Sequence, residues 1–287
     1  MTGAWHCDVS MKGRTIVSQT TNPVMGHAGS TAKAPGHWVL ARLGKKVLRP
    51  GGIELSRQML NSLGTGELDD VVEFAPGLGA TAKMTLRRTP RSYVAVERDD
   101  NAARTVRLLL TGPNRRCIVG RAEDTGLPDA CATIVYGEAM LTMQSATAKD
   151  RIVGEAARLL RPRGRYGIHE MAFGPEAMSQ SLIAQISDEL SGAIHHAVMP
   201  LTVGGWRSLF EGHGFMVLAE HTAPMHLLEP RRLLADEGLA GALRFAWNLL
   251  HDKPSRERVK QMKHVFRKYR EHLLAVAIVS QKRDPTL

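Results

Sequence analysis

Cysteine, aromatic residues and long apolar runs are all scarce in this sequence. The three cysteines, Cys7, Cys117 and Cys131, form no C-x-x-C pair, so we expect buried free thiols rather than a disulfide framework or a metal site. Aromatic residues make up 5% of the chain, which argues against a protein that binds single strands by base stacking. No stretch approaches the roughly 20 uninterrupted apolar residues of a membrane span, and residues 1–13 lack the apolar run of a secretory signal. We therefore expect a cytoplasmic protein without a membrane span.

Acidic residues are scarce at both ends of the chain, which carries a net charge of +10. Residues 1–50 hold seven Lys or Arg and one acid, Asp8, and residues 253–283 hold ten Lys or Arg against Glu257 and Glu271. Basic surfaces attract phosphates, nucleic acids and lipid headgroups. A solvated helix face is the simpler interpretation, so nucleic acid is an alternative partner and not the favoured one.

The sequence does contain a regular alternation of strand and helix patterns. Helical patterns at 37–48 and 53–64 are separated by Pro50-Gly51-Gly52. Short apolar strands with helices between them are then predicted at 71–75, 93–97, 117–120, 132–136 and 165–173. Two late strand patterns, 215–219 and 273–280, flank a helical region at 229–271.

This order of elements predicts an α/β fold. We expect a Rossmann-like, mostly parallel seven-stranded sheet with helices on both faces, a C-terminal antiparallel hairpin and helical cap elements. In such sheets ligands bind at the carboxyl ends of the strands. We expect two parts: an N-terminal arm with a lid helix (1–50), and a main domain (51–287) that contains the helical insert 229–271.

The main candidate site begins at the first predicted strand, which reads V-V-E-F-A-P-G-L-G-A from Val71. The strand carries one acid, Glu73, and turns through Gly77 and Gly79, where glycine lets the backbone approach a ligand. The second strand ends in Glu97, and a carboxylate at that place can accept hydrogen bonds from both hydroxyls of a ribose. The third strand is followed by G-R-A-E-D-T-G-L-P-D at 120–129.

These three segments resemble the class I S-adenosylmethionine-dependent methyltransferases over about residues 66–173. The resemblance implies S-adenosylmethionine as cofactor and residues 51–287 as the methyltransferase domain. It places Glu73 near the methionine amino group, Glu97 at the ribose, and Gly77 and Gly79 beside the cofactor. It also implies cofactor contacts for the remaining predicted residues: Ala75, Pro76, Arg98, Ala122, Glu123 and Gly137.

Two positions depart from the family pattern. The first glycine of G-x-G-x-G is Ala75, and the acid that often precedes Ala-Glu is Arg121, so we expect Glu123 or Asp124 to replace that acid at the adenine. The segment 77–82 also fits the dinucleotide fingerprint G-x-G-x-x-A, which leaves an NAD(P)-dependent oxidoreductase as an alternative. Glu73 argues against it, because a carboxylate there would repel a pyrophosphate.

Methyl transfer from a sulfonium mainly needs an aligned nucleophile and the exclusion of water, and it needs a base only where the acceptor must lose a proton. Glu138 and His169, at the ends of the fourth and fifth strands, are the candidate catalytic residues. Cofactor binding by Glu138 and a purely structural imidazole at His169 stay open as alternatives. Five methionines near the predicted mouth favour a small apolar or amphipathic acceptor: Met140, Met143, Met171, Met178 and Met199.

Other functions are less well supported by the residues. An RNA methyltransferase would use the basic ends, but the loop after the fourth strand reads Tyr136-Gly137-Glu138-Ala139 rather than the N/D-P-P-Y/F of many base methyltransferases. A non-enzymatic cofactor-binding protein has no feature in its favour. His195-His196 has no further ligand at metal-binding spacing, so no metal is predicted.

Overall fold

The computed structural model describes residues 34–284. The helices and strands of that part are, in chain order, α1 (Gly36–Arg42), α2 (Gly52–Leu63), β1 (Asp70–Phe74), α3 (Ala80–Leu86), β2 (Ser92–Glu97), α4 (Asp100–Arg107), β3 (Arg115–Val119), β4 (Ala132–Glu138), the 3-10 turn η1 (Leu141–Met143), α5 (Ala146–Leu159), β5 (Leu160–Phe173), α6 (Gln180–Ile194), β6 (Leu201–Thr202), α7 (Val203–Gly212), β7 (Phe215–Pro224), α8 (Pro230–His251), α9 (Lys253–Lys268) and β8 (Leu273–Lys282). Residues 1–33 of the predicted N-terminal arm, including Cys7, lie outside this description.

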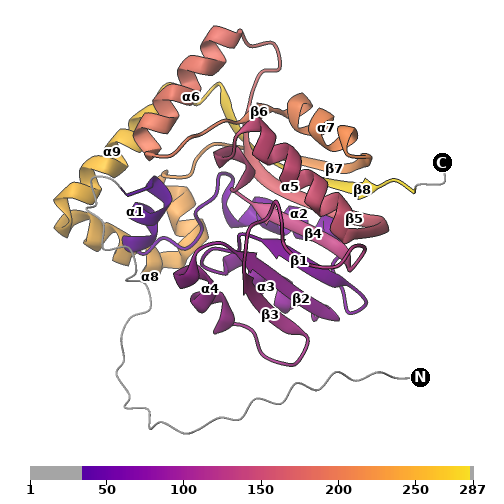
Figure 1. Ribbon diagram of the computed structural model, residues 1–287. Coiled ribbons are helices and arrows are strands. Elements are labelled where there is room, and N and C mark those ends of the chain that lie inside the picture. Colours follow the sequence, from indigo (N-terminus) through magenta and orange to yellow (C-terminus); the bar gives the residue numbers. More distant parts are fainter. Residues whose placement is uncertain (1–33, 285–287) are drawn as a thin grey trace, which may run out of the picture.

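One sheet with the strand order β3-β2-β1-β4-β5-β8-β7 forms the centre of the fold (Figure 1). The five strands β3, β2, β1, β4 and β5 are parallel to one another, whereas β8 runs antiparallel to both β5 and β7. The predicted mostly parallel α/β sheet and its antiparallel C-terminal strands are confirmed. The chain winds outward from β1 in one direction and from β4 in the other, so the switch point of the topology lies between these two strands.

The predicted number of strands is wrong by one, because the sheet has eight. The additional strand, β6, has two residues and pairs in parallel with the end of β5, at Ala172 and Phe173. A pair of residues is too short to produce the alternation of apolar and polar side chains by which strands are recognised in a sequence.

Two apolar cores cover the faces of the sheet. Side chains of β8 alternate between them: Val276 and Ile278 belong to the core that includes side chains of α5 and α7, while Ala277 and Val279 belong to the core that includes side chains of α2, α3 and α4. This period of two is the geometry of a strand buried on both faces. The near-continuous apolar run at 273–280 therefore reflects a strand in the interior of the sheet, and not at its edge.

A third apolar core joins α1, α6, α8 and α9 into a cap beside the sheet. Figure 1 shows these four helices gathered together on one side of the molecule. The insert that forms α8 and α9 lies between β7 and β8 in the chain, as the sequence predicts. Gly238 takes a non-helical conformation (φ 70°) inside α8, so two helical segments meet at a kink there.

A buried ion pair holds this insert to the segment between α1 and α2. Lys45 Nζ lies 3.1 Å from Asp236 Oδ2, and both side chains are fully buried. Asp236 Oδ1 also accepts the backbone N–H of Ile53 at 3.0 Å. Glu237 accepts the backbone N–H groups of Lys46 and Val47 at 2.7 and 2.9 Å, so the start of α8 is tied to the main domain at several points.

Two smaller predictions concern the thiols and the membrane. Cys117 is buried and Cys131 half-buried, and both are free thiols. Within residues 34–284, none of the helices has the length and apolar character that crossing a bilayer requires.

Candidate active site

A cleft of about 500 Å³ lies where β1, β2 and β4 end. This volume is in the range of small-molecule sites, and the position beside the topological switch point is the expected one for a ligand of an open α/β sheet. Nine of the predicted site residues line the cleft: Glu73, Ala75, Pro76, Gly77, Glu97, Arg98, Ala122, Glu123 and Glu138. Gly79, Gly137 and His169 do not line it.

The turn after β1 brings the backbone to the wall of the cleft. Ala75, Gly77 and Gly79 all have positive φ, at 48°, 56° and 74°. A Cβ added to Gly77 would meet nothing within 4 Å, whereas one added to Gly79 would lie 2.4 Å from Leu109 Cδ1. Gly77 therefore leaves room in the cleft, while Gly79 allows α3 to pack against the end of α4.

Glu73 is the most deeply buried carboxylate in the cleft wall, with 3% of its surface exposed. The hydroxyls of Tyr93 on β2 and Tyr136 on β4 both donate to Glu73 Oε2, the latter at 2.5 Å. Burial raises the pKa of Glu73 to about 7, although the two tyrosine hydrogen bonds oppose this rise. A cationic group entering the cleft would favour the ionised form.

Glu97 lies at the end of β2 and is held by backbone amides. Its Oε2 accepts the N–H of Gly77 and its Oε1 the N–H of Asp99, both at 3.0 Å. Each carboxylate oxygen can accept a second hydrogen bond. The carboxylate is thus fixed in orientation at the cleft wall and retains acceptor capacity for two hydroxyl groups.

The segment after β3 contributes the far wall of the cleft. Ala122 and Glu123 line the cleft, but Asp124 does not. Glu123 Oε1 accepts Arg121 Nε at 2.6 Å. Burial alone would raise the pKa of Glu123, but hydrogen bonds and the charge of Arg121 lower it, so this carboxylate is ionised and held by Arg121. Of the two acids expected to replace the missing one, only Glu123 lines the cleft.

Glu138, at the end of β4, is the centre of a buried polar cluster. Arg49 Nη1 lies 3.1 Å from Glu138 Oε2, and the Thr81 hydroxyl donates to the same oxygen. His169 Nδ1 lies 3.0 Å from Glu138 Oε1. Burial by itself would raise the pKa of Glu138, but the charge of Arg49 and the hydrogen bond from His169 outweigh it and lower the pKa to about 2.

His169 lies behind this carboxylate and is fully buried. Its Nε2 faces the carbonyl oxygen of Pro50, and its Nδ1 faces Glu138 Oε1 and the hydroxyl of Ser56. The neighbouring Glu170 is also fully buried, and its oxygens accept the backbone N–H groups of Met140, Leu141 and Thr142 at 2.8 to 3.0 Å. His169 and Glu170 therefore fix Glu138 and the loop after β4.

Arg49 is a site residue that the sequence does not reveal. It is 8% exposed, lines the cleft, and its Nη2 has no hydrogen-bond partner within residues 34–284. It lies between α1 and α2, outside every motif, so no local pattern links it to Glu138. Tyr93 and Tyr136 are also missed, although a tyrosine in a buried strand is itself a signal, because its hydroxyl needs a partner.

Part of the cleft wall, here called its apolar end, is formed by apolar side chains. Trp38 and Leu48 line the cleft, together with Met140 and Met143. A second, smaller cavity of about 80 Å³ shares four wall residues with the cleft: His37, Leu48, Ala139 and Met143. Met171 lines this second cavity, while Met199 is 44% exposed and Met178 packs against the core of the cap. Three of the five predicted methionines thus lie at this apolar end.

Metal binding has no support in the described part of the chain. His196 lines the cleft, but residues 34–284 contain no group of three or more His, Cys, Asp or Glu side chains that could hold a metal ion.

Comparisons with known proteins agree with this architecture. The family described as "Methyltransferase domain" matches residues 72–168. An uncharacterized protein of Haemophilus influenzae is 32% identical over 252 residues, which cover 86% of this chain and 98% of that protein. Among solved structures, a cyclopropane synthase from Mycobacterium tuberculosis has a TM-score of 0.66 at 14% identity, covering 88% of this chain and 97% of that one. The phosphoethanolamine N-methyltransferase 2 of Haemonchus contortus, in complex with S-adenosyl-L-methionine, has a TM-score of 0.66 at 12% identity, covering 87% and 57%.

The solved structures have low sequence identity to this chain, so they establish only the fold. The family match and the Haemophilus influenzae protein establish the family. The methyltransferase prediction is confirmed, and the NAD(P)-dependent oxidoreductase alternative is dropped. The chain belongs to the same family as the Haemophilus influenzae protein and is a class I S-adenosylmethionine-dependent methyltransferase.

Proposed function

We propose that the protein transfers a methyl group from S-adenosylmethionine to a small apolar or amphipathic acceptor by in-line displacement in the cleft. The observation that supports this proposal is the mixed wall of the cleft. Carboxylates and a glycine turn line it together with Trp38, Leu48, Met140 and Met143, and Leu48 and Met143 also line a further apolar cavity. Apolar lining of this kind favours an acceptor with a substantial apolar part.

The polar residues of the cleft wall fit S-adenosylmethionine. The open space beside Gly77 accommodates a ligand at the backbone. Glu73 faces the cleft with a carboxylate that a cationic amino group would ionise, and Glu97 retains two acceptor sites for ribose hydroxyls. Arg49 Nη2, buried and without a partner within residues 34–284, matches a carboxylate. We assign the adenine to the wall formed by Ala122 and Glu123, with Ala75, Pro76 and Arg98 completing the pocket.

When bound, S-adenosylmethionine supplies an electrophilic methyl group on a sulfonium, so the protein mainly has to orient the reactants and exclude water. Glu138, with a pKa of about 2, is a weak base, and His169 does not line the cleft. We assign both a positioning role: His169 orients Glu138, and Glu138 orients Arg49. On this assignment the acceptor either needs no deprotonation or loses its proton to solvent.

The N-terminal part and the insert would form the wall around the acceptor. Helix α1 brings Trp38 to the cleft and packs against α9, which belongs to the insert 229–271. We propose that residues 1–50 act as an arm and lid over the methyltransferase domain 51–287. The cytoplasmic location expected from the sequence stays a prediction.

Ligand binding and methyl transfer provide the test. We expect S-adenosylhomocysteine, but not NAD or NADP, to raise the melting temperature, because a ligand that binds only the folded state stabilises it. With labelled cofactor, incorporation into apolar or amphipathic small molecules and not into RNA supports the proposal. Incorporation into RNA alone would favour the second candidate, an RNA methyltransferase that uses the basic ends. If S-adenosylhomocysteine fails to bind the folded protein, the proposal is wrong.

A further inference from the structure

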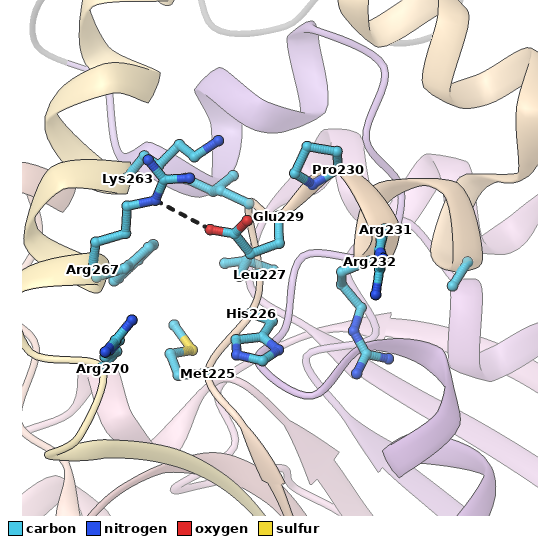
Figure 2. A pocket seen from close by; sticks show the side chains of 13 residues that line it. Met225, His226, Leu227, Glu229, Pro230, Arg231, Arg232, Lys263, Arg267 and Arg270 are labelled. Carbon is cyan, nitrogen blue, oxygen red and sulfur yellow. Dashed lines mark hydrogen bonds and ion pairs between the residues drawn. The ribbon is translucent and has the colours of Figure 1, made fainter.

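A second large depression, here called the basic groove, lies apart from the cleft between the start of α8 and the helix α9. It has a volume of about 1050 Å³. Figure 2 shows Lys263 and Arg267 of α9, with Arg270 just after that helix, on one side of it and Arg231 and Arg232 of α8 on the other. The segment that connects β7 to α8 passes between these two sides.

The positive charge of the basic groove is largely uncompensated. Glu229 is its one acidic lining residue, and its Oε1 lies 3.3 Å from Arg267 Nε. Arg231 and Lys263 form no ion pair with any carboxylate of residues 34–284, and Arg270 has only a contact of 3.5 Å with Glu271, in which both side chains are mostly exposed. Like charges gathered in one depression repel each other and attract anions. The groove therefore has the electrostatics of an anion site.

The floor of the basic groove is apolar. Met225, Leu227 and Phe266 line it and are 4 to 8% exposed. The same three residues line the apolar cavity of about 80 Å³, and other residues of that cavity also line the cleft. Groove, cavity and cleft are thus adjacent in that order. A molecule with an anionic head and an alkyl chain matches this sequence of surfaces.

Two other occupants match the groove less well. Residues 1–33 contain one acid, Asp8, against Lys12, Arg14 and Lys33, so this segment is not complementary in charge. Single-stranded RNA binds through exposed aromatic platforms as well as charge. Phe266 is the one Phe, Tyr or Trp in the wall of the basic groove, and it is 6% exposed and packs in the core of the cap.

We propose that the basic groove binds the phosphate or carboxylate head of an amphipathic molecule whose alkyl part enters the apolar cavity. This inference rests on the proposed function in one respect: it assigns that molecule as the methyl acceptor. The acceptor would then be held by its charge at a distance from the atom that is methylated.

Titration calorimetry with alkyl phosphates, below their micelle concentrations, tests the site without any cofactor. Burying one methylene contributes roughly 0.8 kcal/mol, about four-fold in affinity. We therefore expect octyl phosphate to bind at least ten-fold more tightly than butyl phosphate, and more tightly than inorganic phosphate or octanol. The double substitution Arg231→Gln and Lys263→Gln should weaken octyl phosphate about ten-fold at low salt.

A matched control removes two charges from α9 outside the groove, by Lys253→Gln and Lys260→Gln. This variant should bind octyl phosphate like the wild type. Equal binding of octyl phosphate by wild type and the Arg231→Gln, Lys263→Gln variant would overturn the proposal. So would binding of inorganic phosphate as tight as that of octyl phosphate, or a preference for an RNA oligonucleotide that depends on Arg231 and Lys263.

Titration of S-adenosylhomocysteine into the same preparations separates this inference from the proposed function. Both double variants should bind it like the wild type, which also shows that they are folded. Where S-adenosylhomocysteine binds and octyl phosphate does not, the basic groove proposal fails and the methyltransferase proposal stands. Where octyl phosphate binds and S-adenosylhomocysteine does not, the groove binds amphipathic molecules, but the assignment of such a molecule as the methyl acceptor fails.

Discussion

At the scale of single residues, the two glycines of the β1–α3 turn have different tasks. Both have positive φ, which an L side chain adopts only at a cost of roughly 1–2 kcal/mol. Only Gly77 lines the cleft, and only Gly79 is pressed against a neighbouring side chain, that of Leu109. The sequence motif treats the two positions alike, whereas their surroundings separate ligand binding from packing.

The substitution Gly77→Ala should therefore act on binding. We expect the affinity for S-adenosylhomocysteine, measured by calorimetry, to fall at least ten-fold, with a loss of about 1 kcal/mol in the free energy of unfolding. Gly79→Ala is the matched control, and it should lose more stability because its Cβ would lie 2.4 Å from Leu109 Cδ1. A Gly77→Ala protein that binds like the wild type would contradict the placement of the cofactor at this turn.

Glu73 makes cofactor binding depend on pH. Its pKa of about 7 means that the free protein is largely protonated there at pH 6 and largely ionised at pH 8. A cation binds the ionised form better, so the affinity for S-adenosylhomocysteine should rise about ten-fold from pH 6 to pH 8. In the Glu73→Gln variant this dependence should disappear, and the affinity should be low throughout. A wild-type affinity that does not change over this range would contradict a contact between Glu73 and the amino group.

The same group also affects stability, with the opposite dependence on pH. Because the folded pKa of Glu73 lies above the ordinary value of 4.5, its contribution to stability is fully present below about pH 4.5 and is lost as the pH rises through about 7. Glu73→Gln should therefore be more stable than the wild type at pH 8 and should lose this advantage at pH 5. Urea unfolding at the two pH values measures the difference.

At the scale of secondary structure elements, the turn η1 depends on one buried carboxylate. Glu170 Oε1 accepts the N–H groups of Met140 and Leu141, and Oε2 accepts the N–H and the hydroxyl of Thr142. The substitution Glu170→Gln replaces one of these two oxygens with an amino group, which cannot accept a hydrogen bond. Because each oxygen accepts two hydrogen bonds, either arrangement leaves two buried donors without an acceptor. At about 1–3 kcal/mol for each, the free energy of unfolding should fall by roughly 2–6 kcal/mol.

The control for this prediction is Glu220→Gln, which removes a partly exposed ion pair with Arg207. Such pairs contribute about 1 kcal/mol or less. If both substitutions cost the same in urea unfolding, Glu170 does not hold η1 in the way described.

Elements with a local pattern could be predicted from the sequence, and elements made by distant pairing could not. The first four strands, which are short apolar runs, were expected within two or three residues of their observed bounds. Helix α5 passes directly into β5 at Leu160, where Pro162 and Gly164 suggest a longer break. Strand β6 exists only because it meets the end of β5.

The same distinction applies to the candidate site. Glu73, Gly77 and Glu97 were found because each ends a strand or follows one within a few residues, and the parallel sheet brings such ends together. Arg49 comes from a segment before β1, and nothing in its neighbours indicates that it will meet Glu138 on β4. Residues that reach a site through tertiary packing leave no periodic trace in the sequence.

At the scale of the whole molecule, the ion pair between Lys45 and Asp236 joins the cap to the main domain. In Asp236→Asn, Lys45 keeps only Glu237, at 3.9 Å, in a fully buried position. Removing one partner of a buried pair costs about 3–5 kcal/mol. We expect a loss of this size in urea unfolding and faster hydrogen exchange in residues 230–251.

Two further variants make this prediction specific. Glu54→Gln, which removes an exposed pair with Arg57, should change the stability by less than about 0.5 kcal/mol. The double substitution Lys45→Met and Asp236→Leu should recover much of the loss, because an apolar pair of similar volume replaces the buried charges. If it recovers none, the hydrogen bond of Asp236 to Ile53 is the more important contact.

The position of β8 between β5 and β7 also governs how the nascent chain can fold. The ribosome makes β7 before the whole insert and makes β8 after it, so the outer strand of the sheet emerges well before the one strand it pairs with. Until then both β7 and the adjoining side of β5 present unpaired backbone, which is a hazard for aggregation. On ribosomes stalled before Leu273, residues 215–224 should be open to proteases, and they should become protected once Lys282 has left the exit tunnel.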